Sequence, residues 1–151
     1  MKLWILIADA GRARIFSSDG NALPLREVNG MIHPRSRVRG SELFTSRPGR
    51  VRTGPNGRNV SAMPPHTEPK EVEAVRFAQS LSQLLQRARH RGSFEQLAIA
   101  APPHFLGLLR DRLDVQVRKC LVTCLNKDYT LTPSRDLPPL LEGVRRAAAR
   151  A

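Results

Sequence analysis

The chain has few aromatic residues, only two cysteines and no long apolar run. Its N-terminal apolar stretch, residues 3–8, is six residues long, whereas the core of a secretion signal needs roughly 7 to 15 residues. No window approaches the ~20 consecutive apolar residues of a membrane span. We therefore expect a cytoplasmic protein that does not insert into membranes.

The shortage of cysteine excludes a disulfide framework. Cys120 and Cys124 are too few and too close together for one, and they fit a reducing compartment. We interpret both as reduced, buried small residues that lie on one face of a strand. A zinc site needs three or four ligands, and no histidine is paired in spacing with these cysteines, whether His33, His66, His90 or His104. The sequence predicts neither a metal site nor a cofactor.

Positive charge, by contrast, is abundant. The chain has 25 Lys and Arg against 13 Asp and Glu, a formal charge of +12, and such a field attracts RNA, DNA or acidic membrane surfaces. Half of this excess lies in residues 30–67, where seven arginines face the single acidic residue Glu42. With one Trp, one Tyr and five Phe, the chain offers little material for base stacking, so sequence-specific reading of a single strand is not expected.

Residues 30–67 also hold five of the twelve prolines and five of the ten glycines. Few apolar residues remain there to be buried, so we expect a long, mobile basic loop. Two interpretations stay open: a solvated insert without a ligand, or a segment that contacts a polyanion. In the second, the candidate RNA-binding residues are Arg35, Arg37, Arg39, Arg47, Arg50, Arg52 and Arg58.

The rest of the chain alternates strand and helix patterns, which predicts a single α/β domain over residues 1–151. We expect a mixed sheet of about five strands with helices on its faces. Gly107, inside the second predicted helix, suggests a close backbone approach. The expected strands are residues 3–9, 13–17, 22–29, 94–101 and 119–126; the expected helices are residues 69–91, 102–113 and a C-terminal one that starts between 136 and 139.

Five strings occur in order over nearly the whole chain: "WILIADAGRARIF", "RPGR", "VRFAQSLSQLL", "LAIAAPPHFLGLLR" and "NKDYT". Together they resemble the bacterial host attachment protein family. That family is in turn similar to the central domain of archaeal and eukaryotic peptide-chain release factors. The resemblance implies a truncated RNase H-like α/β fold, with a long basic loop between the third strand and the first helix, and RNA-rich surroundings.

One departure concerns the chemistry of that loop. In release factors it carries a Gly-Gly-Gln tripeptide that positions the hydrolytic water, and no such tripeptide occurs here. Gly57 and Asn59 retain some flexibility and an amide, but Arg58 separates them, and a backbone packed against a tRNA end would not tolerate that exchange easily. The resemblance therefore supports the fold rather than peptide release.

No catalytic constellation emerges elsewhere in the chain. His104, in the first turn of its helix, is typical of a surface or capping residue rather than a general base. A two-metal nuclease would need clustered carboxylates, but the available ones fall at a strand end, at helix ends and in a turn. They are Asp9, Asp111, Asp114, Asp128 and Asp136.

Three functional hypotheses follow. The first is a cytosolic RNA- or ribosome-associated binding module that acts through the arginine loop without catalysis. The second, implied by the family, is a factor that promotes attachment to host cells through envelope or surface contacts, or indirectly. The third is a diverged translation factor resembling a peptidyl-tRNA hydrolase.

Overall fold

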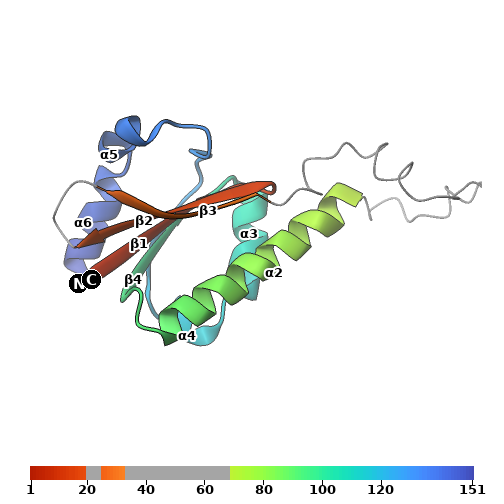
Figure 1. Cartoon of the computed structure of the whole chain (residues 1–151), viewed down its shortest axis with the longest axis horizontal. Coiled ribbons are helices and arrows are strands. Elements are labelled where there is room, and N and C mark those ends of the chain that lie inside the picture. The colour runs from red at the N-terminus through yellow and green to blue at the C-terminus, as the bar shows by residue number, and fades with distance from the viewer. Residues whose placement is uncertain (20–24, 33–68) are drawn as a thin grey trace, which may run out of the picture.

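A computed structural model describes residues 1–19, 25–32 and 69–151. Five strands form one mixed sheet in the order β3-β2-β1-β4-β5 (Figure 1). The first three strands make an antiparallel meander, and β4 and β5 both run parallel to β1. This confirms the predicted mixed sheet of five strands in an α/β fold. The strands are β1 (Lys2–Ala8), β2 (Arg12–Asp19), β3 (Arg26–Ile32), β4 (Gln96–Ala100) and β5 (Leu121–Leu125).

Helices cover both faces of the sheet. One face carries α2 (Pro69–His90), α3 (Pro103–Arg112) and α4 (Val115–Arg118), and the other carries α5 (Leu137–Leu140) and α6 (Glu142–Arg150) (Figure 1). Side chains of β1 alternate between these layers: Leu6 packs with α2 and α3, whereas Ile5 and Ile7 pack with the C-terminal helices. None of the described helices is long and apolar enough to cross a lipid bilayer.

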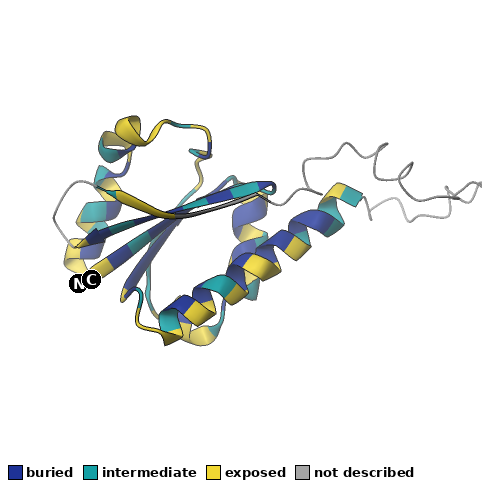
Figure 2. Ribbon diagram, viewed as in Figure 1, coloured by how far each residue is buried: buried dark blue, intermediate teal, exposed yellow. Residues whose placement is uncertain are grey.

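The long helix α2 forms where its pattern predicts it. Pro69 stands at the first position, where the missing N–H costs nothing, and basic side chains occupy the last turn. Phe77, Leu81 and Leu85 are buried against the sheet, while Leu84 is only partly buried at the margin of the core. Figure 2 shows buried residues along the side of α2 that faces the sheet and exposed residues on the opposite side.

The central strand is also confirmed. Every residue of β4 is buried, because the strand lies between β1 and β5 and is covered on both faces. A strand buried on both sides reads as a nearly continuous apolar run, which is the pattern of residues 94–101. The one polar side chain of β4, Gln96, donates a hydrogen bond from Nε2 to the carbonyl of Ala148 at 2.8 Å.

Two predicted boundaries are wrong. The third strand covers residues 26–32 instead of 22–29, so the predicted loop of residues 30–67 starts too early by three residues. Met31 and Ile32 pair with Ala13 and Arg12 of β2. The register shifts between Ile15 and Phe16, and this irregularity changes the strand's alternation, which is the signal used to place it.

The C-terminal helix is divided into two pieces. A short α5 ends at Leu140, and α6 begins at Glu142 after Leu141, whose backbone angles (φ −103°, ψ 13°) depart from helical values. Pro138 and Pro139 lie in the first turn of α5, where their missing N–H groups cost nothing, so the break is located at Leu141. Leu137 and Leu141 are nevertheless fully buried and fix this corner on the sheet.

The predicted close approach at Gly107 is wrong. A Cβ built at this position would meet no atom within 4 Å, so nothing inside the described chain requires a glycine there. Gly92 differs, because its φ of +78° lies in the left-handed region that ends α2.

Candidate functional site

Two segments far apart in the sequence, residues 9–14 and 130–134, meet at one edge of the sheet. Because β1, β4 and β5 are parallel, their carboxyl ends lie together, and in α/β proteins this is the edge where ligands bind. We call it the carboxyl edge. Asp9 follows β1 there and Thr130 follows β5, and the Thr130 hydroxyl lies 3.1 Å from Asp9 Oδ2. Two of the sequence strings, "ADAG" and "KDYT", are thus in contact.

Both oxygens of the Asp9 carboxylate face polar groups of the protein. Its Oδ1 accepts hydrogen bonds from the backbone N–H groups of Gly11 and Arg12, both at 2.8 Å, and its Oδ2 faces the Thr130 hydroxyl. An aspartate that accepts from backbone two and three residues ahead stabilises a tight turn. Asp9 therefore shapes the β1–β2 turn and joins it to the segment after β5.

Thr130 connects two carboxylates through one hydroxyl. Its Oγ1 lies 2.5 Å from Asp128 Oδ1, and its backbone N–H donates to the same oxygen at 3.0 Å. A hydroxyl carries a single proton, so it donates to Asp128 or to Asp9 at any moment, and the shorter distance favours Asp128. The side chain is buried, with 4% of its surface exposed. This hydroxyl holds the turn together rather than facing a ligand.

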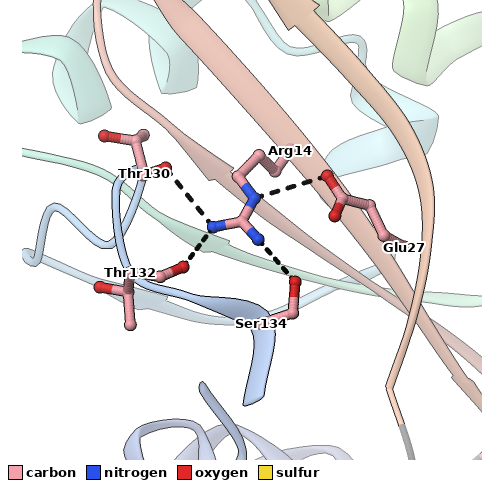
Figure 3. A network of polar contacts seen from close by, with 5 residues as sticks. All are labelled: Arg14, Glu27, Thr130, Thr132 and Ser134. Atoms are coloured by element: carbon pink, nitrogen blue, oxygen red, sulfur yellow. Dashed lines mark hydrogen bonds and ion pairs between the residues drawn. The ribbon is translucent and has the colours of Figure 1, made fainter. Parts of the chain in front are cut away.

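Arg14 of β2 joins residues 130–134, which follow β5, to strands β2 and β3 (Figure 3). Its Nη1 donates to the carbonyls of Thr130 (3.4 Å) and Thr132 (2.5 Å), and its Nη2 donates to Ser134 Oγ at 2.8 Å. Its Nε pairs with Glu27 of β3 at 3.4 Å, and its Cζ lies 5.0 Å from the Phe16 ring centre. The planar guanidinium thus uses its fixed fork of donors to join β2, β3 and residues 130–134.

His104 joins the starts of two helices. Its Nε2 lies 2.9 Å from Glu71 Oε1, and this pair connects the first turn of α3 to the first turn of α2. The imidazole is largely exposed. The prediction that His104 is a surface residue is therefore consistent with its position, and its carboxylate partner fixes how it lies.

Residues 4–141 match the family described as protein required for attachment to host cells. The chain belongs to this family. No curated protein matches it. Among solved structures it is similar to one described as an archaeal protein, at 14% identity and a TM-score of 0.46, covering 99% of this chain and 36% of that one. It is also similar to an archaeal translation termination factor, at 14% identity and a TM-score of 0.47, covering 99% and 41%. The chain thus spans less than half the length of either.

The seven arginines predicted to contact RNA in this host attachment family member all lie outside the described residues. The chain on either side of them is described, and both flanks lie at the carboxyl edge. Ile32 pairs with Arg12, next to the end of β1, and Pro69 begins α2 within one turn of the Glu71–His104 pair. The arginines in question are Arg35, Arg37, Arg39, Arg47, Arg50, Arg52 and Arg58.

Further cations stand at this edge. Arg12 begins β2 and its Nε is buried without a hydrogen-bond partner in the structure, while Lys127 is exposed just after β5. Neither forms an ion pair with any carboxylate of the described ranges. Over those ranges 18 Lys and Arg stand against 11 Asp and Glu. The positive balance therefore extends beyond the arginine segment itself.

The carboxylates considered for a nuclease have separate roles. Asp114 caps α4 by accepting from the Gln116 N–H at 2.9 Å, and Asp111 is exposed on α3. Asp136 stands at the N-cap position of α5, the helix end at which it was predicted, although its side chain accepts no capping hydrogen bond. Only Asp9 and Asp128 come together, at Thr130. In residues 1–19, 25–32 and 69–151 no three His, Cys, Asp or Glu side chains form a group that could hold a metal ion.

The cysteines are free thiols, as predicted, but they are half-buried rather than buried. Cys120 precedes β5 and Cys124 lies within it, and both pack against the core under α2 and α3. Burial raises the pKa of the Cys124 thiol above its ordinary value of 9.0, and the nearby Arg110 partly opposes this rise.

Sequence reasoning missed Arg14 and Thr130 as organising residues. Thr130 ends the quoted string "NKDYT", but its partner Asp9 lies 121 residues away in sequence, and no local pattern reports such a contact. Arg14 had one detectable signal, because a charged residue alternating with Ala13 and Ile15 on a strand must find polar partners on its own face.

Proposed function

We propose that this host attachment family member is a cytosolic RNA- or ribosome-associated binding module that acts through phosphate contacts rather than catalysis. The observation that carries the proposal is the placement of charge. Seven arginines follow Ile32 and precede Pro69, and both of these flanking positions lie at the carboxyl edge, where Arg12 and Lys127 add further cations. A concentrated positive field of this kind attracts polyanions.

Arginine is suited to this role for a second reason. Its guanidinium binds phosphate oxygens with two parallel hydrogen bonds, which adds geometry to charge. Contacts to the backbone position a protein on a nucleic acid without reading its sequence, and the scarcity of aromatic side chains agrees with that mode. We therefore expect binding that depends strongly on salt and weakly on sequence.

The polar groups of the carboxyl edge support a non-catalytic role. The Thr130 hydroxyl faces Asp9 and Asp128, and both carboxylates accept from the adjacent backbone. A general base or nucleophile needs an atom directed at a substrate, and these atoms are directed at the protein's own turns.

A second candidate is the attachment role that the family description states. The same positive charge would bind anionic envelope components. Sedimentation of a cell lysate through a sucrose gradient separates the two candidates, because an RNA- or ribosome-associated protein enters the ribosomal fractions and an envelope protein enters the membrane fractions. Treatment with ribonuclease should release the protein from the ribosomal fractions only if RNA holds it there.

The binding test is an affinity series for single-stranded RNA at increasing salt. Each phosphate contact contributes about −0.7 to the slope of log affinity against log salt, so three to five engaged arginines give roughly −2 to −3.5. Replacing Arg47, Arg50, Arg52 and Arg58 by Ser should flatten this slope and weaken binding to unrelated sequences equally.

The matched control removes four exposed cations elsewhere, at Arg87, Arg91, Arg146 and Arg150. It lowers the net charge by the same amount and leaves the arginine segment intact. An equal loss of affinity in the two variants would show that only net charge matters, and the segment would lose its assigned role.

A further inference from the structure

A hollow of about 510 Å³ lies between α3, α4 and the start of β5. It is far from the carboxyl edge, because α3 starts there and runs toward the opposite edge, where β5 begins. Ligand sites have volumes of roughly 300 to 1,000 Å³, so the hollow is large enough for a nucleotide-sized molecule. It is lined by Gly107, Arg110, Asp111, Leu113, Arg118 and Leu121.

Gly107 has no role in the internal packing of the described chain. It lies in the middle of α3, where glycine destabilises a helix relative to alanine, and a Cβ there would meet no atom within 4 Å. Gly107 is exposed and lines the hollow. The absence of a side chain leaves room there for a bound group to lie against the helix backbone.

The rim of the hollow is positively charged. Arg110 and Arg118 are both exposed, and Arg118 Nη2 donates to the carbonyl of Arg110 at 2.6 Å, which holds this side chain across the end of α3. Neither guanidinium forms an ion pair with a carboxylate of the described residues. The lining includes one carboxylate, Asp111, and two apolar side chains: Leu113, which is buried, and Leu121, which is half-buried.

We propose that the hollow binds one nucleotide unit of a single-stranded RNA, a proposal that rests on the function proposed above. Arg110 and Arg118 bind the phosphate, and the base lies against Leu113 and Leu121 where Gly107 leaves room. Asp111 accepts a hydrogen bond from a base amino group or a ribose hydroxyl. Two cations, one acceptor and an apolar wall match the three parts of a nucleotide, whereas an inorganic anion would leave the leucines and Asp111 without a role.

The direct test is an NMR titration of the full chain with adenosine 5′-monophosphate, observing backbone amides and arginine Nε–H groups. Shifts should concentrate at Gly107, Arg110 and Arg118. Inorganic phosphate alone and adenosine alone should each bind more weakly, because each lacks half of the contacts. Shifts spread evenly over all exposed arginines, or equal affinity for a short oligoglutamate peptide, would overturn the proposal.

Two variants sharpen this test. Gly107→Leu places a side chain in the hollow, and leucine has a higher helix propensity than glycine. This variant should therefore abolish the localised NMR shifts. Arg110→Gln with Arg118→Gln should weaken adenosine monophosphate binding by about tenfold or more, because each removes a charge-assisted contact. The control, Arg87→Gln with Arg91→Gln, removes the same charge from α2 and the turn after it, and an equal effect in the control would overturn the assignment. Circular dichroism verifies that each variant is folded.

The RNA measurements separate failure of the hollow from failure of the proposed function. In the salt series, the Arg110 and Arg118 double variant should reduce the slope by about 1.4, the value for two lost contacts. If the unmodified chain binds RNA and this variant keeps both affinity and slope, the hollow is not an RNA-binding site, and the proposed function is retained. If the unmodified chain binds no RNA while adenosine monophosphate still shifts Gly107, the hollow is a nucleotide site and the proposed function is wrong.

Discussion

The carboxyl edge and the hollow beside Gly107 use polar residues in opposite ways. At the carboxyl edge, Thr130 faces Asp9, and Asp9 and Arg14 bind the nearby backbone. At the hollow, two guanidiniums are exposed, and a helical glycine has no packing role. Two of the recognisable sequence strings, "WILIADAGRARIF" and "NKDYT", meet at the first region, where Asp9, Arg14 and Thr130 hydrogen-bond within the fold. A third, "LAIAAPPHFLGLLR", ends at the hollow with Gly107 and Arg110, where the guanidinium forms no ion pair with a described carboxylate.

The largest expected effect concerns the core that supports both regions. Leu81 of α2 is fully buried in the layer that also contains the buried side chains of α3. Leu81→Ala should lower the free energy of unfolding by roughly 2 to 5 kcal/mol. Chemical denaturation measures this change. Leu84→Ala is the matched control, because the partly buried Leu84 should cost clearly less, and equal costs would show that the helix faces the sheet in another register.

The next effect tests whether the carboxyl edge is structural. Thr130→Val keeps the shape of the side chain but removes the hydroxyl that faces Asp9 and Asp128. A hydrogen bond to a charged group contributes roughly 1.5 to 3 kcal/mol, and because Asp9 is half-buried and Asp128 is exposed, the loss should lie at the low end of this range. Thr123→Val, at a half-buried position of β5, is the control, because valine suits a strand. Unchanged stability in Thr130→Val, with altered RNA binding, would make this edge a ligand site instead.

A smaller loss is expected when Arg14 becomes Lys. The charge remains, but a lysine has a single point of attachment and cannot reach Glu27, Ser134 and the two carbonyls together. Each lost hydrogen bond costs about 0.5 to 1.5 kcal/mol. In Arg14→Lys, amide hydrogen exchange should become faster at residues 130–134 than in the unmodified chain, while exchange in β4 should stay the same. Protection equal to that of the unmodified chain would mean that Arg14 is not what holds this segment.

The elements with strong periodicity were predictable, and the contacts between distant residues were not. Helix α2 and strand β4 follow from an apolar face and a continuous apolar run, which are local signals. The break in the C-terminal helix falls at Leu141, whose backbone leaves helical values while its side chain is buried, and β3 has an irregular register with β2. Neither is visible in a short window. The family was also predictable, because whole strings identify it.

Gly107 shows why the candidate site was harder to predict. The sequence alone does not show whether another backbone packs against a helical glycine or whether an open hollow lies beside it. Only the surroundings of its missing Cβ distinguish these cases. The pairing of Arg110 with Arg118 depends likewise on the turn through α4, which the sequence pattern did not indicate.

Gly107→Ala should produce a small gain in stability. Replacing a helical glycine where alanine fits without strain stabilises a protein by about 0.4 to 1 kcal/mol, and the added methyl meets no neighbour. Thermal denaturation measures the gain. Gly92→Ala is the contrasting variant, because a positive φ of +78° strains any L side chain, so this change should destabilise. A loss of stability in Gly107→Ala would reveal a close contact that the fold does not show.

The smallest effect links the core to the hollow through Cys124. Burial raises the pKa of this thiol, and the cation of Arg110 acts in the opposite direction. Because the folded state favours the protonated thiol, its contribution to stability is complete below the ordinary value of 9.0 and is lost as the pH rises through the raised pKa. Thiol alkylation as a function of pH, in a chain with Cys120→Ala, should therefore follow a titration above that value.

Arg110→Gln should move this titration of Cys124 higher still, since the opposing charge is gone. A phosphate bound to Arg110 should move it in the same direction by neutralising the guanidinium, so adenosine monophosphate should slow alkylation of Cys124 in the unmodified hollow and leave the rate unchanged in Arg110→Gln. Equal slowing in both would place the nucleotide elsewhere.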